Sequence, residues 1–170
     1  LKELGLLFNN FELLDICVDS NFDILKRIKF YFFKKDKYYF RSCGEINKKM
    51  DDIRSWDRDV VVGEGIRFKS RGDILRIYNK TMEIAASNKY YISTYFKIKG
   101  LDVDKSVYRK EIHISRRSLY EKKIDIKLSD LSNEIELMGL FKFYWNKFVD
   151  FREINSSKRI AHYKRINILK

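Results

Sequence analysis

The sequence predicts an α+β fold, with a central antiparallel sheet, helices packed on one face of it, and the other face open. Segments of alternating apolar and polar residues predict half-buried strands, at residues 11–19, 38–41, 60–68, 73–78 and 107–114. Segments with apolar residues at helical spacing predict helices, at residues 21–33, 79–87 and 129–152. Because the strands carry polar side chains on their second face, we expect helices on the first face only.

The first strand shows this division most clearly. Its apolar side chains are Leu14, Ile16 and Val18, and its polar ones are Asp15, Cys17 and Asp19. Side chains alternate along a strand, so the two sets lie on opposite faces. We expect the helices to cover the apolar set. The helix that follows, residues 21–33, has Ser20 or Asn21 as its expected N-cap.

A hairpin, a loop, a long helix and a basic tail complete the predicted fold. Residues 69–72 join two strands as a hairpin, in which Gly72 can supply a positive φ. Residues 45–59 are polar and charged and predict a loop. The longest helix, residues 129–152, carries an apolar stripe that is best explained by packing on the core. Residues 156–170 form a basic tail.

Composition restricts the class of protein. The 170 residues are 45% hydrophobic, which suffices for one domain with a real core. Lys and Arg number 36 against 24 Asp and Glu, a net charge of +12. Such a balance favours an anionic partner: nucleic acid first, an acidic membrane surface second. The alternative is that the lysines are simply solvated.

Several classes are excluded by what the sequence lacks. It has no CxxC pair for a zinc site, and no Walker-type phosphate loop, GxSxG or HExxH motif. No apolar run reaches the ~18 residues of a membrane span, and no signal peptide is recognisable. We therefore expect a cytoplasmic protein without a membrane partner.

Three strands carry residues that suit phosphodiester chemistry. Their polar faces hold Asp15 with Asp19, Glu111 with His113, and Arg76 with Tyr78. Carboxylates bind Mg²⁺ and an imidazole accepts Mn²⁺. A tyrosine hydroxyl can act as a covalent nucleophile, and an arginine can clamp a phosphate. The alternatives are solvated carboxylates, a structural His113, and a Tyr78 that is one ordinary tyrosine among 11.

Four segments, in order, resemble initiators of rolling-circle replication in phages and plasmids. The strand-and-helix phrase KSRGDILRIYNKTMEI resembles their "R-I-Y-[ND]-K" motif, and YRKEIHIS resembles their later "R-x-E-[FIV]" strand. Upstream, LLDICVD is similar to their acidic strand, although Leu14 replaces the usual basic residue. Downstream, FKFYWNKFVDFRE resembles their closing aromatic helix. The resemblance spans residues 13–153.

The resemblance implies an HUH-endonuclease-like fold and metal-dependent nicking of one strand at a replication origin. A tyrosine would become linked to the 5′ phosphate, and the free 3′ hydroxyl would prime synthesis. Matching motif to motif, Tyr78 and Lys80 would be catalytic, and Asp15, Glu111 and His113 would bind Mg²⁺ or Mn²⁺. Tyr108 and Tyr120 are the alternative nucleophiles. DNA-binding residues would be Lys69, Arg71, Arg76 and Arg109.

This interpretation also assigns domains and partners. Residues 1–155 would form the nicking domain, whose N-terminal part could be absent, and residues 156–170 the basic tail. The expected partners are single-stranded or origin DNA in a bacterial host cell, together with a host helicase. Two alternatives stay open: a DNA-binding module of a phage or plasmid protein without catalysis, and a structural or partner-binding viral protein.

Overall fold

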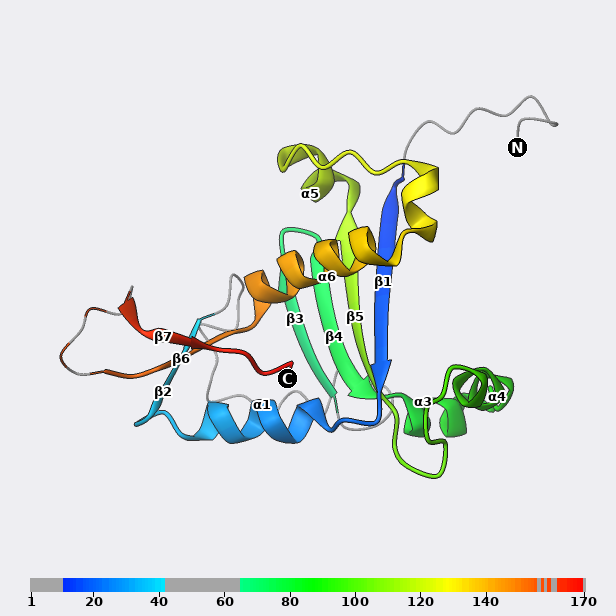
Figure 1. The fold of residues 1–170 in the computed structure, drawn as a ribbon, viewed down its shortest axis with the longest axis horizontal. Helices are drawn as coiled ribbons and strands as arrows, with labels where there is room; N and C mark the ends of the chain where they lie inside the picture. The colour runs from blue at the N-terminus through cyan, green and yellow to red at the C-terminus, as the bar shows by residue number, and fades with distance from the viewer. Residues whose placement is uncertain (1–10, 42–64, 156, 158, 160–161, 170) are drawn as a thin grey trace.

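The computed structural model describes residues 11–41, 65–155, 157, 159 and 162–169, and it has an α+β fold. Its main sheet has four antiparallel strands in the order β1-β5-β4-β3 (Figure 1). The strands are β1 Leu13–Ser20, β3 Gly65–Ser70, β4 Asp73–Asn79 and β5 Tyr108–Ser115. The predicted antiparallel sheet is confirmed, with β5 between β1 and β4.

Two helices cover one face of this sheet. They are α1, Ile24–Phe33, and α6, Glu134–Phe148, which crosses the strands (Figure 1). Their buried residues join the apolar side chains of the strands in one core. From the strands it includes Leu14, Ile16, Ile66, Phe68, Leu75, Ile77, Ile112 and Ile114. The expectation that helices cover the Leu14 and Ile16 face is confirmed, and the other face of the strands carries the polar residues.

A second, smaller sheet lies beside the first core. It contains β2 Tyr38–Arg41, β6 Asp150–Glu153 and β7 Lys164–Ile166, in the order β2-β6-β7. The rings of Phe40 and Phe151 lie 4.6 Å apart, and Phe40 also contacts Phe68 of the main sheet. These aromatic contacts join the small sheet to the main core.

In the described part of the chain, four short helical elements lie at the two ends of the main sheet (Figure 1). α3, Lys80–Ser87, follows β4 directly and packs with α4, Tyr91–Ile98. The pair has a small core of its own, formed by Ile84, Phe96 and Val107. At the opposite end of the strands, α5, Arg116–Glu121, follows β5, and η4, Leu128–Ser132, precedes α6 (Figure 1).

A buried carboxylate connects four elements at the α5 end. The Asp73 side chain has no exposed surface. It accepts hydrogen bonds from the backbone and hydroxyl of Ser115, from Ser118 and from Lys147. Burial alone would raise the pKa of Asp73, yet these bonds hold that pKa below its ordinary value. The network thereby ties β4, β5, α5 and α6 together.

The hairpin between β3 and β4 is confirmed. Gly72 has φ of 92°, in the region that favours glycine. A Cβ at this position would lie 3.3 Å from the hydroxyl oxygen of Ser115, so space is also limited. The turn therefore needs glycine both for its backbone and for its contact with the end of β5.

The predicted N-cap of α1 was wrong. The cap of α1 is Asp23, whose carboxylate accepts from the Lys26 amide. Ser20 accepts from Lys110 instead, and the Asn21 side chain bonds the backbone of Asp102 and that of Ser106. Ser20 and Asn21 therefore bond residues that are distant in sequence, and neither caps α1.

The predicted helix over residues 129–152 was also too long. η4 and α6 are separate, because the Asn133 side chain caps α6 by accepting from the amides of Ile135 and Glu136. Val149 is extended, and β6 then pairs with β2. The helix therefore ends where the chain begins to pair with β2.

The predicted basic tail is partly built into the fold. β7 pairs with β6, and Ile168 is buried. Arg165 forms an ion pair with Asp150, which Arg152 also contacts. The boundary placed at residue 155 therefore falls inside the small sheet. The predicted loop at residues 45–59 and the start of the strand predicted at 60–68 lie outside the described residues.

None of the helices in the described ranges combines the length and the apolar character that a bilayer span requires.

Candidate functional site

The candidate site lies on the open face of the main sheet, where the strand register brings together residues far apart in sequence. On β5, His113 pairs with Asp15 of β1, and Glu111 pairs with Arg76 of β4. Tyr78 of β4 lies opposite Arg109. Side chains two residues apart share a strand face, so all these groups project from the side away from the helices.

The centre of the face is a hydrogen-bonded group formed by Tyr78, Glu111 and Arg76. The hydroxyl of Tyr78 donates to Oε2 of Glu111 at 3.1 Å. Arg76 donates to Oε1 of the same carboxylate at 3.4 Å. Burial and the nearby Glu111 charge raise the pKa of Tyr78 above its ordinary value. At neutral pH the phenol is therefore protonated and directed at a carboxylate.

Asp15 and His113 form a second pair on the same face. Nδ1 of His113 lies 2.8 Å from Oδ1 of Asp15. The side chain of Asp15 is 47% exposed and that of His113 is 25% exposed, so both remain open to solvent. With Nδ1 held by the carboxylate, Nε2 is the nitrogen that remains for a partner.

A third pair lies near the end of β1. Arg109 donates twice to Asp19, with both distances 2.8 Å. Burial acts against the charged guanidinium, yet the bonds to Asp19 raise the pKa of Arg109 above its ordinary value. Cys17 lies between these pairs, and burial raises the pKa of its thiol to about 11. The thiol therefore stays protonated at neutral pH.

The structure places the other predicted site residues around this centre. Lys80, the first residue of α3, is buried, pairs with Glu83, and has Nζ 5.8 Å from the centre of the Tyr78 ring. Lys69 is exposed on β3, on the same face as Arg76. Arg71 is in the hairpin turn and lines a pocket with Asp73 and Lys147, so it lies apart from Tyr78.

The sequence reasoning overlooked Arg67. It pairs with Arg76 in the register of β3 and β4, and it is exposed. The alternation of Ile66 and Phe68 with Arg67 was the signal that could have identified it, because the two apolar neighbours face the core. The open face therefore has a basic border on β3 beside the central carboxylates.

The three predicted metal ligands share the face but do not converge. Asp15 and His113 bond each other, whereas Glu111 bonds Arg76 and Tyr78. Within the described part of the chain, no group of three or more His, Cys, Asp or Glu side chains is placed to hold a metal ion. As they are arranged, these residues do not fit a metal centre.

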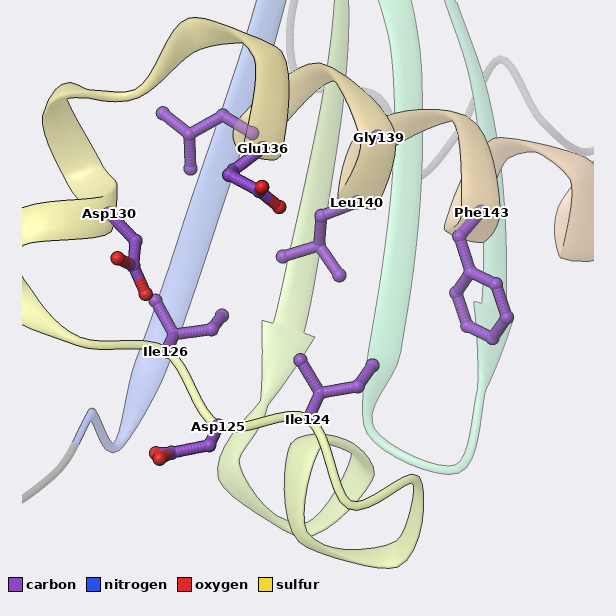
Figure 2. Close-up of a pocket in the computed structure, with 9 residues that line it drawn as sticks. Ile124, Asp125, Ile126, Asp130, Glu136, Gly139, Leu140 and Phe143 are labelled. Carbon is purple, nitrogen blue, oxygen red and sulfur yellow. The ribbon is translucent and has the colours of Figure 1, made fainter.

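A pocket on the helix side offers a different environment. It has a volume of about 260 Å³ and lies between α6 and the segment that leads to η4 (Figure 2). Ile124, Ile126 and Leu140 supply apolar walls, while Asp130 and Glu136 supply carboxylates. This combination does not suit an anionic ligand, so the open sheet face remains the candidate site.

Comparison of the chain with protein-family models, with curated proteins and with solved structures gives no match. The candidate site therefore depends on the geometry of its own residues.

Proposed function

We propose that this chain nicks one strand of DNA as a rolling-circle replication initiator with an HUH-endonuclease-like fold. The observation that carries the proposal is the hydrogen bond from Tyr78 to Glu111 on an open, basic-bordered sheet face. A nucleophile within hydrogen-bond reach of a base is the arrangement that covalent catalysis requires. The net charge of +12 suits a DNA substrate.

The proposed step begins with attack of the Tyr78 oxygen on the scissile phosphorus. Its proton passes to Glu111, the phosphorus–O3′ bond breaks, and the 3′ oxygen takes a proton from water. A 5′-phosphotyrosine link and a free 3′ hydroxyl result. Because the link conserves the phosphodiester bond energy, attack by a 3′ hydroxyl can reverse the step.

Two neighbouring cations would stabilise the phosphate in this step. Arg76 contacts Glu111 and is 47% exposed, so its guanidinium can also reach a phosphate oxygen. Lys80 lies against the Tyr78 ring and would add positive charge near the phosphorus. Fixed positive groups stabilise the charge that develops on the phosphate oxygens.

The test is incubation with single-stranded origin-type DNA and Mn²⁺, followed by mass spectrometry of the protein. We expect a covalent adduct on the peptide that contains Tyr78, and none in Tyr78→Phe. Tyr120→Phe tests the alternative nucleophile, and it should leave the adduct unchanged, since Tyr120 is exposed on α5 at the opposite end of the strands. An adduct that survives Tyr78→Phe contradicts the assignment of Tyr78.

A second candidate function is DNA binding without catalysis. It is favoured by the observation that Asp15, Glu111 and His113 do not converge on a metal position among the described residues. In that case binding would be unaffected by EDTA, and no cleaved strand would form on any sequence. Cleavage that requires a divalent ion and disappears in His113→Ala would instead support the nicking enzyme and its predicted metal ligands.

A further inference from the structure

The segment of the α3–α4 helix pair exposes three tyrosine side chains. Tyr90, Tyr91 and Tyr95 are 61%, 72% and 53% exposed, and Ile98 is 77% exposed. Tyr91, Tyr95 and Ile98 recur at helical spacing, so they form one stripe along α4. Phe96, on another side of the same helix, is buried against α3. The stripe therefore lies outside the small core and is exposed to solvent.

The charges of the same segment are mainly positive. Lys89, Lys97 and Lys99 are exposed, and Nζ of Lys99 lies 5.8 Å from the centre of the Tyr95 ring. Two acidic residues of the segment form ion pairs with lysines, Glu83 with Lys80 and Asp102 with Lys105. Lysine is depleted in protein–protein interfaces, so tyrosines interleaved with lysines fit an anionic, aromatic partner better than a protein partner.

The helix pair is held firmly beside the candidate site. α3 starts two residues after Tyr78, and the Lys80 amide donates to the carbonyl of Val107 at 2.8 Å. The Val107 amide in turn donates to the Thr81 hydroxyl at 2.9 Å. Figure 1 shows α3 and α4 beside the end of β4 that carries Tyr78. The helix pair therefore adjoins the end of β4 at which Tyr78 lies (Figure 1).

We infer that the exposed stripe of α4 is a stacking platform for the unpaired bases of single-stranded DNA. The inference rests on the proposed function, because it names the form of DNA that reaches Tyr78. Tyr91 and Tyr95 are about 6 Å apart along the helix axis. That spacing exceeds the ~3.4 Å rise between stacked bases, so each ring can meet a base of its own. Lysines alongside the rings would contact the phosphates.

The test compares an oligothymidylate with an abasic oligonucleotide of the same length and charge, by fluorescence anisotropy. Stacking acts on bases and not on phosphates. We therefore expect Tyr91→Ala and Tyr95→Ala each to weaken binding of the oligothymidylate about tenfold. Binding of the abasic strand should change by less than about twofold. Tyr91→Phe should bind like the wild type, because the ring rather than the hydroxyl makes the contact.

Tyr120→Ala is the matched control, since it removes another exposed tyrosine, from α5, and it should bind both oligonucleotides like the wild type. Equal losses for both oligonucleotides in Tyr91→Ala, or no loss for either, overturn the inference. So does concentration-dependent self-association in sedimentation that Tyr91→Ala abolishes, because the stripe would then be a protein interface. Tyr78→Phe should retain full discrimination between the two strands. If the wild-type protein forms no adduct but still distinguishes the two oligonucleotides, the nicking proposal fails and the stacking inference stands.

Discussion

At the scale of single residues, the environment of Tyr78 gives a direct prediction. Burial and the Glu111 carboxylate both raise its pKa, and Glu111→Gln removes the charge while keeping a hydrogen-bond acceptor. The pKa of Tyr78 should therefore fall in this variant. NMR of ¹³C-labelled tyrosine, with the signal assigned through Tyr78→Phe, measures the change. Glu121→Gln, on α5, is the control and should leave the pKa of Tyr78 unchanged.

Asp73 gives the corresponding prediction for stability. Asp73→Asn should lower the free energy of unfolding by about 2 kcal/mol at pH 7, because charge-assisted bonds from Ser118 and Lys147 are weakened in a buried site. The pKa of Asp73 is lower in the folded protein than in the unfolded chain. Its contribution is therefore present above about pH 4 and is lost as the pH falls through the folded value.

Urea unfolding at a series of pH values checks this prediction. The difference between the wild type and Asp73→Asn should shrink as the pH falls below about 4. Asp125→Asn, at an exposed position, should follow the wild type throughout. A difference that stays constant with pH would mean that lost packing, and not the carboxylate charge, explains the destabilisation.

At the scale of elements, strand alternation was the dependable signal. It identified the two faces of β1 and β5 correctly, because a residue period of two follows from backbone geometry alone. It therefore placed Asp15, Glu111, His113 and Tyr78 on one face. It could not show which side chains bond each other, because rotamers depend on neighbouring strands. The Tyr78–Glu111 bond is such a case.

Element ends were harder to predict, because distant contacts decide them. Asn21 looks like a cap in sequence, yet it bonds the backbone of Asp102, 81 residues away. The apolar stripe of α6 continues smoothly in sequence into Val149 and Phe151, which belong to the helix end and to β6. The strand at residues 38–41 was predicted and is β2, but its pairing in a small sheet was not, because β6 and β7 are short and distant from it in sequence.

The corrected cap of α1 is testable on its own. Asp23→Ala should lower the free energy of unfolding by about 1 kcal/mol, since it removes the acceptor for the Lys26 amide at the start of the helix. Denaturant unfolding followed by circular dichroism measures the loss. Asp36→Ala removes a carboxylate from the turn after α1 and should change stability much less. Equal losses in both variants would refute the capping role.

At the scale of the whole molecule, two kinds of charge are separated in space. The open face has carboxylates at its centre, on β1 and β5, and the exposed Arg67 and Lys69 at its border, on β3. Arg76, on β4, lies between the centre and this border. The chain as a whole carries +12. In the proposed function the basic residues hold the strand, and the central group performs the chemistry. Holding a strand by phosphate contacts releases counterions, so binding must weaken as salt rises.

This separation predicts how salt dependence changes with mutation. Replacing Arg67, Lys69 and Arg76 together by Ala should reduce the slope of log K against log salt by about 2, since each phosphate contact of a single strand contributes about 0.7. Anisotropy titrations at several KCl concentrations measure the slope. Replacing Lys26, Lys35 and Lys142, which are exposed on or near α1 and α6, removes the same charge from the helix side. If both triple variants lose the same slope, only net charge attracts DNA, and the open face is not where the strand lies.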